Sequence, residues 1–282
     1  MKRDLYTQTC IDCSALLTKK YSTSFSLGIL MLGKEVRDDI YAIYGFVRLA
    51  DEIVDTYQDK NPARELSLLK EETFRAIDNG ISFNPILQAF QHTVHEHKID
   101  RSYIDAFLYS MEMDLTDRVY DRQSYETYIY GSAEVVGLMC LKVFCGKDEE
   151  KFHRLIEPAR KLGSAFQKVN FLRDIRSDLE DRKRVYFPEL DVQRFSDPEK
   201  RQIEAEIEEE FRLAQQGIRG LPSNCRSGVQ LALNYYRGLL LKISKRPANE
   251  LFESRIRISN FHKILLFIEN LVLPSTEKYR HA

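Results

Sequence analysis

The stretch 162–178, LGSAFQKVNFLRDIRSD, is the part of the sequence that decides the fold. Wound as a helix at about 100° per residue, it places its polar side chains on one narrow stripe, made of Gln167, Asn170, Asp174 and Asp178. Apolar side chains occupy much of the remaining circumference, and a helix that is apolar nearly all round is typically buried. Because unpaired charge is costly to bury, we expect this stripe to face an internal cavity or a partner group.

The stretch 36–57 has the same organisation. Its polar stripe consists of Tyr44, Arg48, Asp51 and Asp55. Ile, Phe, Val, Leu and Ala side chains cover most of the other helical positions, so this helix is also expected to be buried. Two such stripes that face one cavity would form a site for a polyvalent cation.

Each stripe carries two aspartates four residues apart, here called the first acidic pair (Asp51 and Asp55) and the second acidic pair (Asp174 and Asp178). Carboxylates at this spacing lie on one helical face and repel each other when ionised. Magnesium binds through oxygen ligands and commonly also holds a phosphate group. The spacing alone is weak evidence, because the chain contains two more such pairs that we interpret as chance, Asp55/Asp59 and Asp117/Asp121.

Composition narrows the class of protein. The 282 residues are 43% hydrophobic and include only 12 Gly and 8 Pro, which favours a large helical core over an all-β fold. A net charge of −1 gives no sign of a nucleic-acid-binding surface. Five cysteines, an odd number, and a polar N-terminal stretch without a signal peptide indicate a reducing cytoplasm.

Apolar periodicity and the positions of the prolines predict an all-α protein. No Pro/Gly/Ser-rich linker divides the chain, so we expect a single domain over residues 1–282. Helices are expected at 4–21, 35–57, 62–79, 84–97, 100–118, 124–145, 148–180, 198–217, 225–244 and 250–271. The hydroxyl-rich stretch 21–28 lies between the first two, and Pro158 is expected to mark a helix break or a kink.

Four stretches, in this order and spacing, resemble the squalene/phytoene synthase family, and most closely the bacterial phytoene synthases. They are YSTSFSLGILML (21–32), IYAIYGFVRLADEIVD (40–55), YIYGSAEVVGLM (128–139) and GSAFQKVNFLRDIRSDLEDRKRVYFP (163–188). The resemblance covers roughly residues 10–270. It implies an all-α isoprenoid synthase fold in which the two acidic helices face each other across a central cavity.

The resemblance also implies roles for individual residues. Both acidic pairs, together with Asn170, match positions that bind a small cluster of Mg²⁺ ions, for which Mn²⁺ is expected to substitute. Tyr44 and Tyr130 match tyrosines that line the reaction cavity. The positions expected to contact substrate and diphosphate are Ser22, Ser24, Arg48, Gln167, Arg173 and Arg257, with Arg255 or Lys263 as alternatives to Arg257.

The activity that the resemblance implies is that of a magnesium-dependent prenyltransferase. Two geranylgeranyl diphosphates would be joined head to head through prephytoene diphosphate to phytoene, the first hydrocarbon of carotenoid biosynthesis. Two alternatives stay open. One is a squalene or dehydrosqualene synthase that uses farnesyl diphosphate, and the other is a non-catalytic relative that acts in protein assembly.

Three further features leave their interpretation open. The basic cluster Arg182–Lys183–Arg184 is either an exposed turn or a lid over the diphosphate. The small residues of 131–137 either permit close helix packing or bend a helix to admit a prenyl chain. Since substrate and product are long hydrocarbons, we expect a cytoplasmic protein that associates weakly with the inner face of the cell membrane.

Overall fold

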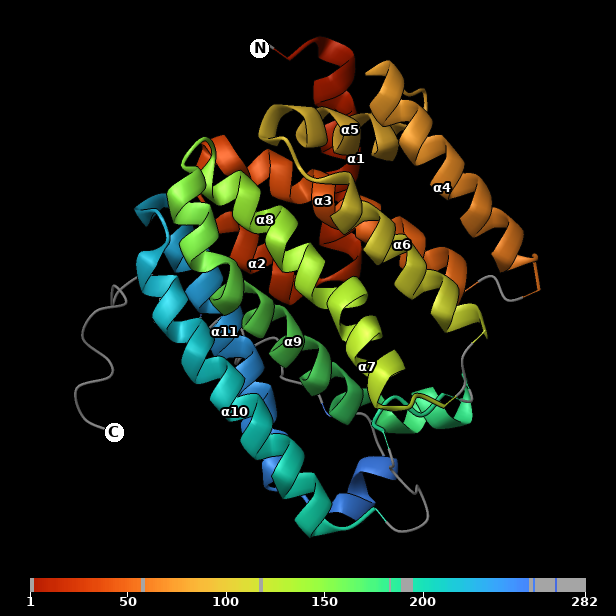
Figure 1. Ribbon diagram of the computed structural model, residues 1–282, viewed down its shortest axis with the longest axis vertical. Helices are drawn as coiled ribbons and strands as arrows, with labels where there is room; N and C mark the ends of the chain where they lie inside the picture. Colours follow the sequence, from red (N-terminus) through yellow and green to blue (C-terminus); the bar gives the residue numbers. More distant parts are fainter. Residues whose placement is uncertain are drawn as a thin grey trace.

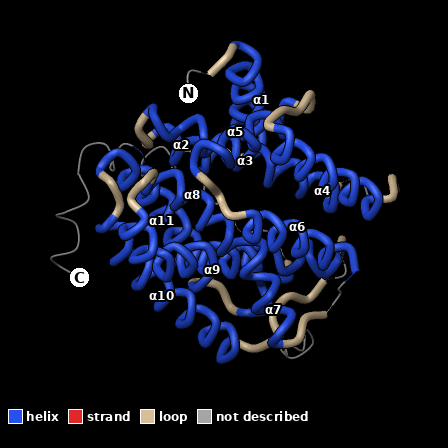
Figure 2. Tube along the Cα trace, turned by 45° about the horizontal axis from the view of Figure 1, so that its top comes forward, coloured by secondary structure: helices blue, strands red, loops and turns tan. Residues whose placement is uncertain are grey.

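The computed structural model describes residues 3–56, 59–116, 119–182, 184–188, 195–253, 256 and 267. The helices of this part of the chain are joined by loops (Figure 2), and the only other pairing among the described residues is one isolated bridge between Val119 and Val185. The helices are α1 Leu5–Tyr21, α2 Thr23–Leu30, α3 Lys34–Asp55, α4 Pro62–Asn79, α5 Pro85–His97, α6 Arg101–Thr116, α7 Arg122–Ile129, η1 Tyr130–Glu134, α8 Val135–Cys145, α9 Glu149–Glu180, α10 Asp197–Gly220, α11 Ser223–Ser244 and η2 Ala248–Phe252. The prediction of an all-α fold is confirmed.

Two groups of helices flank the centre of the molecule (Figure 1). Helices α1, α4 and α5 pack around α3, while α10 and α11 run beside α9. A separate apolar core supports each central helix: Ile43, Phe46 and Ala50 anchor the buried side of α3, and Ala165, Val169 and Leu172 anchor that of α9. Because each helix is held from behind, its polar stripe can face the space between the two groups.

The hydroxyl-rich stretch 21–28, which was expected to lie between two helices, is mostly helical itself. Residues Thr23–Leu30 form α2, and the Ser22 hydroxyl caps it by accepting a hydrogen bond from the Phe25 amide at 3.2 Å. Serine at this position supplies an acceptor for an amide that the helix itself leaves unpaired. The hydroxyl-rich composition therefore marks the beginning of a helix.

Pro158 was expected to mark a helix break or a kink, and it does not break the helix. It lies inside α9, which continues from Glu149 to Glu180.

The expected helix 250–271 lies mostly outside the described residues. Of this range the structure describes the end of η2 with Glu253, and the single positions 256 and 267.

Small residues of 131–137 pack against neighbouring backbone and also lie at a change of helical geometry. A Cβ on Gly131 would approach the Ala106 carbonyl oxygen to 2.4 Å, and one on Gly137 would approach that of Ala159 to 3.0 Å. The same region contains the π-turn η1, a local widening of the helix that is frequent at functional sites. Close helix packing is therefore confirmed, whereas a role in admitting a prenyl chain stays a prediction.

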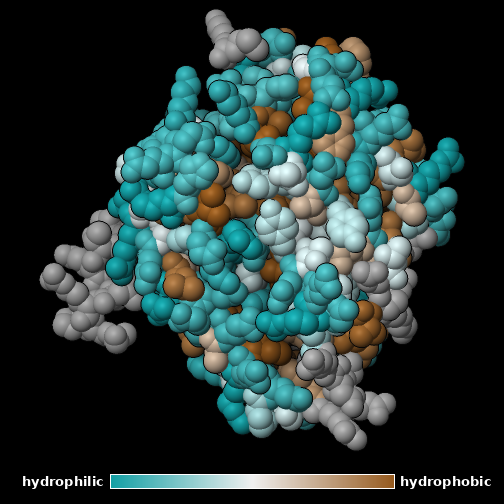
Figure 3. Space-filling view, viewed as in Figure 1, coloured by the Kyte–Doolittle hydropathy of each residue, from teal (hydrophilic) through white to brown (hydrophobic). Residues whose placement is uncertain are grey.

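Within the described residues, the helical run Arg122–Cys145 has the length and hydropathy that a membrane crossing needs. However, 61% of its apolar window is buried inside the protein, as is usual for a core helix. On the face shown in Figure 3, hydrophobic residues form small separate areas among hydrophilic ones.

Candidate active site

A cavity of about 740 Å³ lies between the two groups of helices, within the size range of small-molecule sites. We call the part lined by Asp51, Asp55, Asp114, Asp174 and Asp178 the polar end. The remainder, the apolar end, is lined by side chains from α2, α3, α8, α9, α10 and α11, including Ile29, Ile40, Val136, Leu155, Phe166 and Ile218. One cavity therefore offers charge to one part of a ligand and hydrocarbon to the other.

The first acidic pair lies on the cavity face of α3. Desolvation, followed by the charge of Asp55, raises the pKa of Asp51 to about 7. Arg48 lies one turn before the pair, with 3.8 Å between its Nη1 and Asp51 Oδ2, and also pairs with Glu52. Its guanidinium stacks 4.3 Å from the ring centre of Tyr21. The effect of burial on Asp51 therefore outweighs the opposing charge of Arg48.

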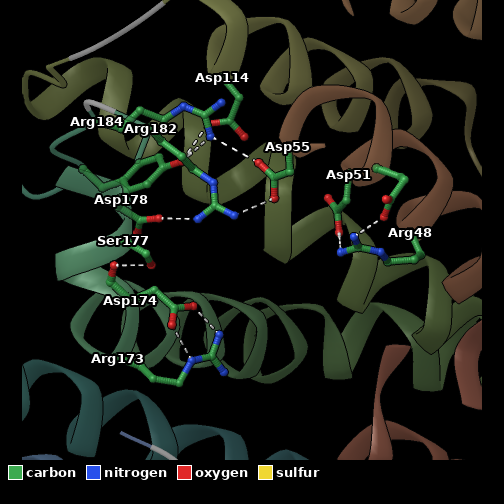
Figure 4. A network of polar contacts seen from close by, with 12 residues as sticks. Arg48, Asp51, Asp55, Asp114, Arg173, Asp174, Ser177, Asp178, Arg182 and Arg184 are labelled. Carbon is green, nitrogen blue, oxygen red and sulfur yellow. Dashed lines mark hydrogen bonds and ion pairs between the residues drawn. The ribbon is translucent and has the colours of Figure 1, made fainter. Parts of the chain in front are cut away.

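The second acidic pair lies on α9 and faces the first (Figure 4). Asp174 accepts a hydrogen bond from Arg173 Nε at 2.9 Å. Burial raises the pKa of Asp178 to about 6, although the neighbouring Arg182 opposes the shift. Both acidic pairs thus contain a carboxylate that is held in an environment unfavourable to its charge.

Gln167 and Asn170 lie on the same stripe of α9 and also line the cavity. Asn170 Oδ1 is buried, and no hydrogen-bond partner for it is present among the described residues. The hydroxyl of Tyr236 lies beside the Asn170 amide. A buried acceptor oxygen without a donor is suited to contact a bound cation.

The basic cluster after α9 is not an exposed turn. Arg182 contacts both acidic helices, with Nη1 2.7 Å from Asp178 Oδ1 and Nη2 3.2 Å from Asp55 Oδ2. Arg184 lies 3.5 Å from Asp55 Oδ1 and 3.3 Å from Asp114 Oδ1 (Figure 4). Lys183 lies outside the described residues. Arg182 therefore lies between the two acidic pairs, and Arg184 connects the first pair with Asp114.

Asp114, on α6, is a component of the site that the sequence analysis missed. It accepts hydrogen bonds of 2.8 Å from the hydroxyls of both Tyr128 and Tyr186. Burial raises the pKa of Asp114, and Arg184 and the two hydroxyls oppose that shift. The sequence carried little signal for it, because Asp114 is one of three acids, with Asp105 and Glu112, in the otherwise mostly apolar run 104–115.

Two predicted tyrosines have different positions. Tyr44 lines the cavity, and desolvation raises its pKa to about 12. Tyr130 is not among the described residues that line the cavity, and its ring centre lies 5.4 Å from the Arg160 guanidinium. Tyr128 reaches the wall instead. Side chains two positions apart on a helix point about 200° apart, so only one of Tyr128 and Tyr130 can face the cavity.

Two of the remaining predicted substrate contacts, Ser22 and Ser24, are not brought to the cavity wall. Ser22 caps α2 and lies beside the Tyr44 hydroxyl. Arg257, like its alternatives Arg255 and Lys263, lies outside the described residues. Arg173, by contrast, does line the polar end.

The acidic pairs fit a cation, although they are not arranged as a finished metal site. In the part of the chain that the structure describes, no three His, Cys, Asp or Glu side chains are close enough together to hold a metal ion. Nevertheless, the raised pKa of Asp51 and the unpaired Asn170 Oδ1 both indicate a need for positive charge. The donor set consists of oxygen atoms, which magnesium prefers.

Comparison with known proteins gives a consistent picture. The family model for squalene/phytoene synthases matches residues 18–262. A phytoene synthase of Arthrospira platensis is 27% identical over 274 residues, which covers 88% of this chain and 88% of that protein. A 15-cis-phytoene synthase of Synechocystis is 28% identical over 273 residues, covering 88% of this chain and 80% of that protein.

Solved structures share the fold. A dehydrosqualene synthase crystallised with a ligand superposes with a TM-score of 0.81 at 23% identity, covering 94% of this chain and 96% of that one. A squalene synthase from Alicyclobacillus acidocaldarius superposes with a TM-score of 0.74 at 20% identity, covering 86% of this chain and 95% of that one. At these identities the likeness concerns the all-α fold.

Proposed function

Because the chain belongs to the squalene/phytoene synthase family, we propose that it joins two geranylgeranyl diphosphates head to head to form phytoene. The observation that carries this proposal is the single cavity, in which five aspartates and four arginines lie at one end and apolar walls at the other. The phytoene synthases among its relatives support the choice of substrate.

In this proposal the polar end holds the diphosphate. Both acidic pairs and Asn170 would hold Mg²⁺ or Mn²⁺, and Arg48 and Arg173 would contact phosphate oxygens. Arginine suits this role because its planar guanidinium can form two parallel hydrogen bonds to a phosphate. When bound, the divalent metal stabilises the negative charge that develops on the departing diphosphate.

The apolar end would hold the prenyl chains and exclude water from the reacting carbons. The C–O bond of the first substrate breaks, and the double bond of the second attacks the resulting allylic carbon. Loss of a proton closes the cyclopropane ring and gives a cyclopropylcarbinyl diphosphate. This intermediate loses its own diphosphate, rearranges and releases a second proton. Phe166 and Tyr236 lie stacked with 3.9 Å between ring centres and both line the cavity. Their faces would stabilise positive charge there.

The decisive experiment compares two substrates. Purified protein is incubated with Mg²⁺ and either geranylgeranyl or farnesyl diphosphate, and the hydrocarbon is identified by mass spectrometry. A forty-carbon product is expected. A thirty-carbon product would assign the chain to squalene or dehydrosqualene synthesis instead, and no product from either substrate would contradict an enzymatic role and favour a non-catalytic function.

Three expectations about the whole protein accompany this proposal. Residues 1–282 act as one catalytic domain, in the cytoplasm, with weak peripheral attachment to the inner face of the cell membrane. The long hydrocarbon chains of substrate and product support the attachment. Sedimentation with liposomes tests it: part of the protein is expected in the pellet, and complete recovery in the supernatant would contradict it.

A further inference from the structure

Arg182 connects the two acidic helices across the polar end of the cavity. Its guanidinium lies 2.7 Å from a carboxylate oxygen of Asp178 on α9 and 3.2 Å from one of Asp55 on α3. Figure 4 shows it between the two carboxylates that the proposed function assigns to the metal. Arg182 therefore pairs with one carboxylate of each acidic pair.

The neighbouring Arg184 is held more firmly. Its side chain is 3% exposed and contacts Asp55, Asp114 and the Tyr186 hydroxyl. The Arg182 side chain is 33% exposed and follows directly after the end of α9. If Arg182 leaves its partners, its guanidinium enters water. If Arg184 moved, the buried carboxylate of Asp114 would lose its counter-charge. Of these two arginines, Arg182 is thus the one that can exchange partners.

The charge at the polar end determines when such an exchange is favourable. Five carboxylates and four guanidinium groups line the described cavity, which leaves one unbalanced negative charge. A divalent cation alone would compete with Arg182 for Asp55 and Asp178. A cation that arrives with diphosphate brings several negative charges, and these offer Arg182 a new partner of the type that arginine prefers.

We propose that Arg182 is an exchangeable counter-cation, which competes with the metal for Asp55 and Asp178 and moves to the diphosphate when metal and diphosphate enter together. This inference rests on the proposed function for the identity of the ligand. It makes metal binding weak in the absence of diphosphate. It also couples the two binding events, because the metal replaces Arg182 at the two carboxylates while diphosphate becomes the new partner of Arg182.

The first test measures metal binding alone. Mn²⁺ is titrated into the protein without diphosphate, and free Mn²⁺ is followed by electron paramagnetic resonance. Arg182→Gln is expected to bind Mn²⁺ roughly two- to fivefold more tightly than the unsubstituted protein, the range for loss of a partly exposed competing ion pair. Arg182→Lys, which keeps the charge, should stay close to the unsubstituted protein. Unchanged or weaker Mn²⁺ binding by Arg182→Gln overturns the proposal, and so does a lack of Mn²⁺ binding in every variant.

A matched control separates this effect from a general loss of positive charge. Arg176 lies on α9 shortly before Arg182, is about half exposed, pairs with Glu180, and does not line the cavity. Arg176→Gln removes the same charge from the surface and is expected to leave Mn²⁺ affinity unchanged. Equal tightening in Arg176→Gln and Arg182→Gln would show a long-range charge effect and would also overturn the proposal.

The second test measures the other half of the exchange. Inorganic diphosphate is titrated into protein saturated with Mg²⁺, and heat is recorded by calorimetry. Arg182→Gln is expected to bind diphosphate roughly tenfold or more weakly, because one charge-assisted contact is lost. Unchanged diphosphate affinity would contradict the transfer. Circular dichroism of each variant verifies that the helices are retained.

Failure of this inference and failure of the proposed function give different results. If the unsubstituted protein makes hydrocarbon from prenyl diphosphates while Arg182→Gln leaves Mn²⁺ and diphosphate affinities unchanged, only the role of Arg182 is wrong. If the unsubstituted protein makes no hydrocarbon but Arg182→Gln shifts both affinities as expected, the exchange is right and the assigned reaction is wrong.

Discussion

Arg184 and Asp114 form an ion pair at the polar end of the cavity, with 3.3 Å between guanidinium nitrogen and carboxylate oxygen. Their side chains are only 3% and 6% exposed. Tyr128 and Tyr186 donate hydrogen bonds to the same carboxylate, so the pair connects α6, α7 and the segment after α9. This buried pair is expected to stay in place when Arg182 exchanges its partners.

Removal of one partner of this pair is expected to destabilise the fold strongly. Arg184→Ala or Asp114→Ala should lower the free energy of unfolding by about 3–5 kcal/mol, because the remaining charge stays buried without its partner. Urea denaturation followed by circular dichroism measures this. The double variant should lose less than the sum of the single variants. The exposed pair Arg101–Asp78 is the control, since its replacement should change stability little; equal losses at both pairs would contradict the buried role.

Removal of one aspartate from either acidic pair is expected to abolish nearly all turnover while the protein stays folded. Asp51→Ala and Asp174→Ala should each lower the rate of hydrocarbon formation by about 10²-fold or more, because stabilisation of the departing diphosphate is lost. Product is quantified by mass spectrometry, with circular dichroism as the check on folding.

Asp59→Ala serves as the matched control for this experiment. Asp59 stands four residues after Asp55 with the same sequence spacing, but its side chain is exposed and pairs with Lys60. Its replacement should leave turnover unchanged. Retained turnover in Asp51→Ala or Asp174→Ala would remove those residues from the mechanism.

Low pH is expected to weaken the cluster formed by Arg3, Asp39 and His97. Burial alone would raise the pKa of Asp39, but the hydrogen bond with His97 and the charge of Arg3 bring it below its ordinary value. A lowered pKa means that the unfolded state takes up a proton first as the pH falls. The stability that Asp39 contributes is therefore present above about pH 4 and is lost as the pH falls further, towards the lowered pKa.

Thermal unfolding between pH 7 and pH 3 tests this. Asp39→Asn should be less stable than the unsubstituted protein at pH 7, and the difference should shrink below about pH 4. Asp38→Asn is the control, because Asp38 contacts the same Arg3 but is one-third exposed. A difference for Asp39→Asn that stays constant down to pH 3 would contradict the assigned coupling.

Close helix packing at Gly131 gives a fourth prediction. Gly131→Ala should destabilise the protein by about 1–3 kcal/mol, since the new methyl group overlaps a backbone oxygen of α6 that cannot move aside freely. Gly137→Ala should cost less, because the nearest atom to its new methyl group is 3.0 Å away rather than 2.4 Å. Denaturation midpoints of the two variants give the comparison, and a larger loss at Gly137 would contradict it.

Helical periodicity was enough to place much of the polar end. Asp51, Asp55, Asn170, Asp174 and Asp178 all lie on stripes that a constant turn of the helix defines, and all five line the cavity. Such stripes are a local property, because residues three or four apart lie on one face whatever the helix packs against. The all-α fold could be predicted for the same reason.

The tyrosines and serines show where local rules stop. Tyr128 and Tyr130 belong to one apolar run, and only the packing of α7 and the π-turn on α6 and α9 selects Tyr128 for the cavity. Ser22 and Ser24 resemble a substrate-contacting stretch, yet Ser22 is used to cap α2. Residue type alone does not distinguish these uses.

The sequence by itself determined that two mostly apolar helices carry acidic stripes, and so that the interior holds negative charge that needs a partner. Which side chain partners that charge depends on tertiary contacts between distant parts of the chain. Arg182 lies 127 residues from Asp55 along the chain, and Asp114 is 72 residues from Tyr186. No helical period relates residues so far apart; their contact depends on how the segments after α6 and α9 return to the same end of the cavity.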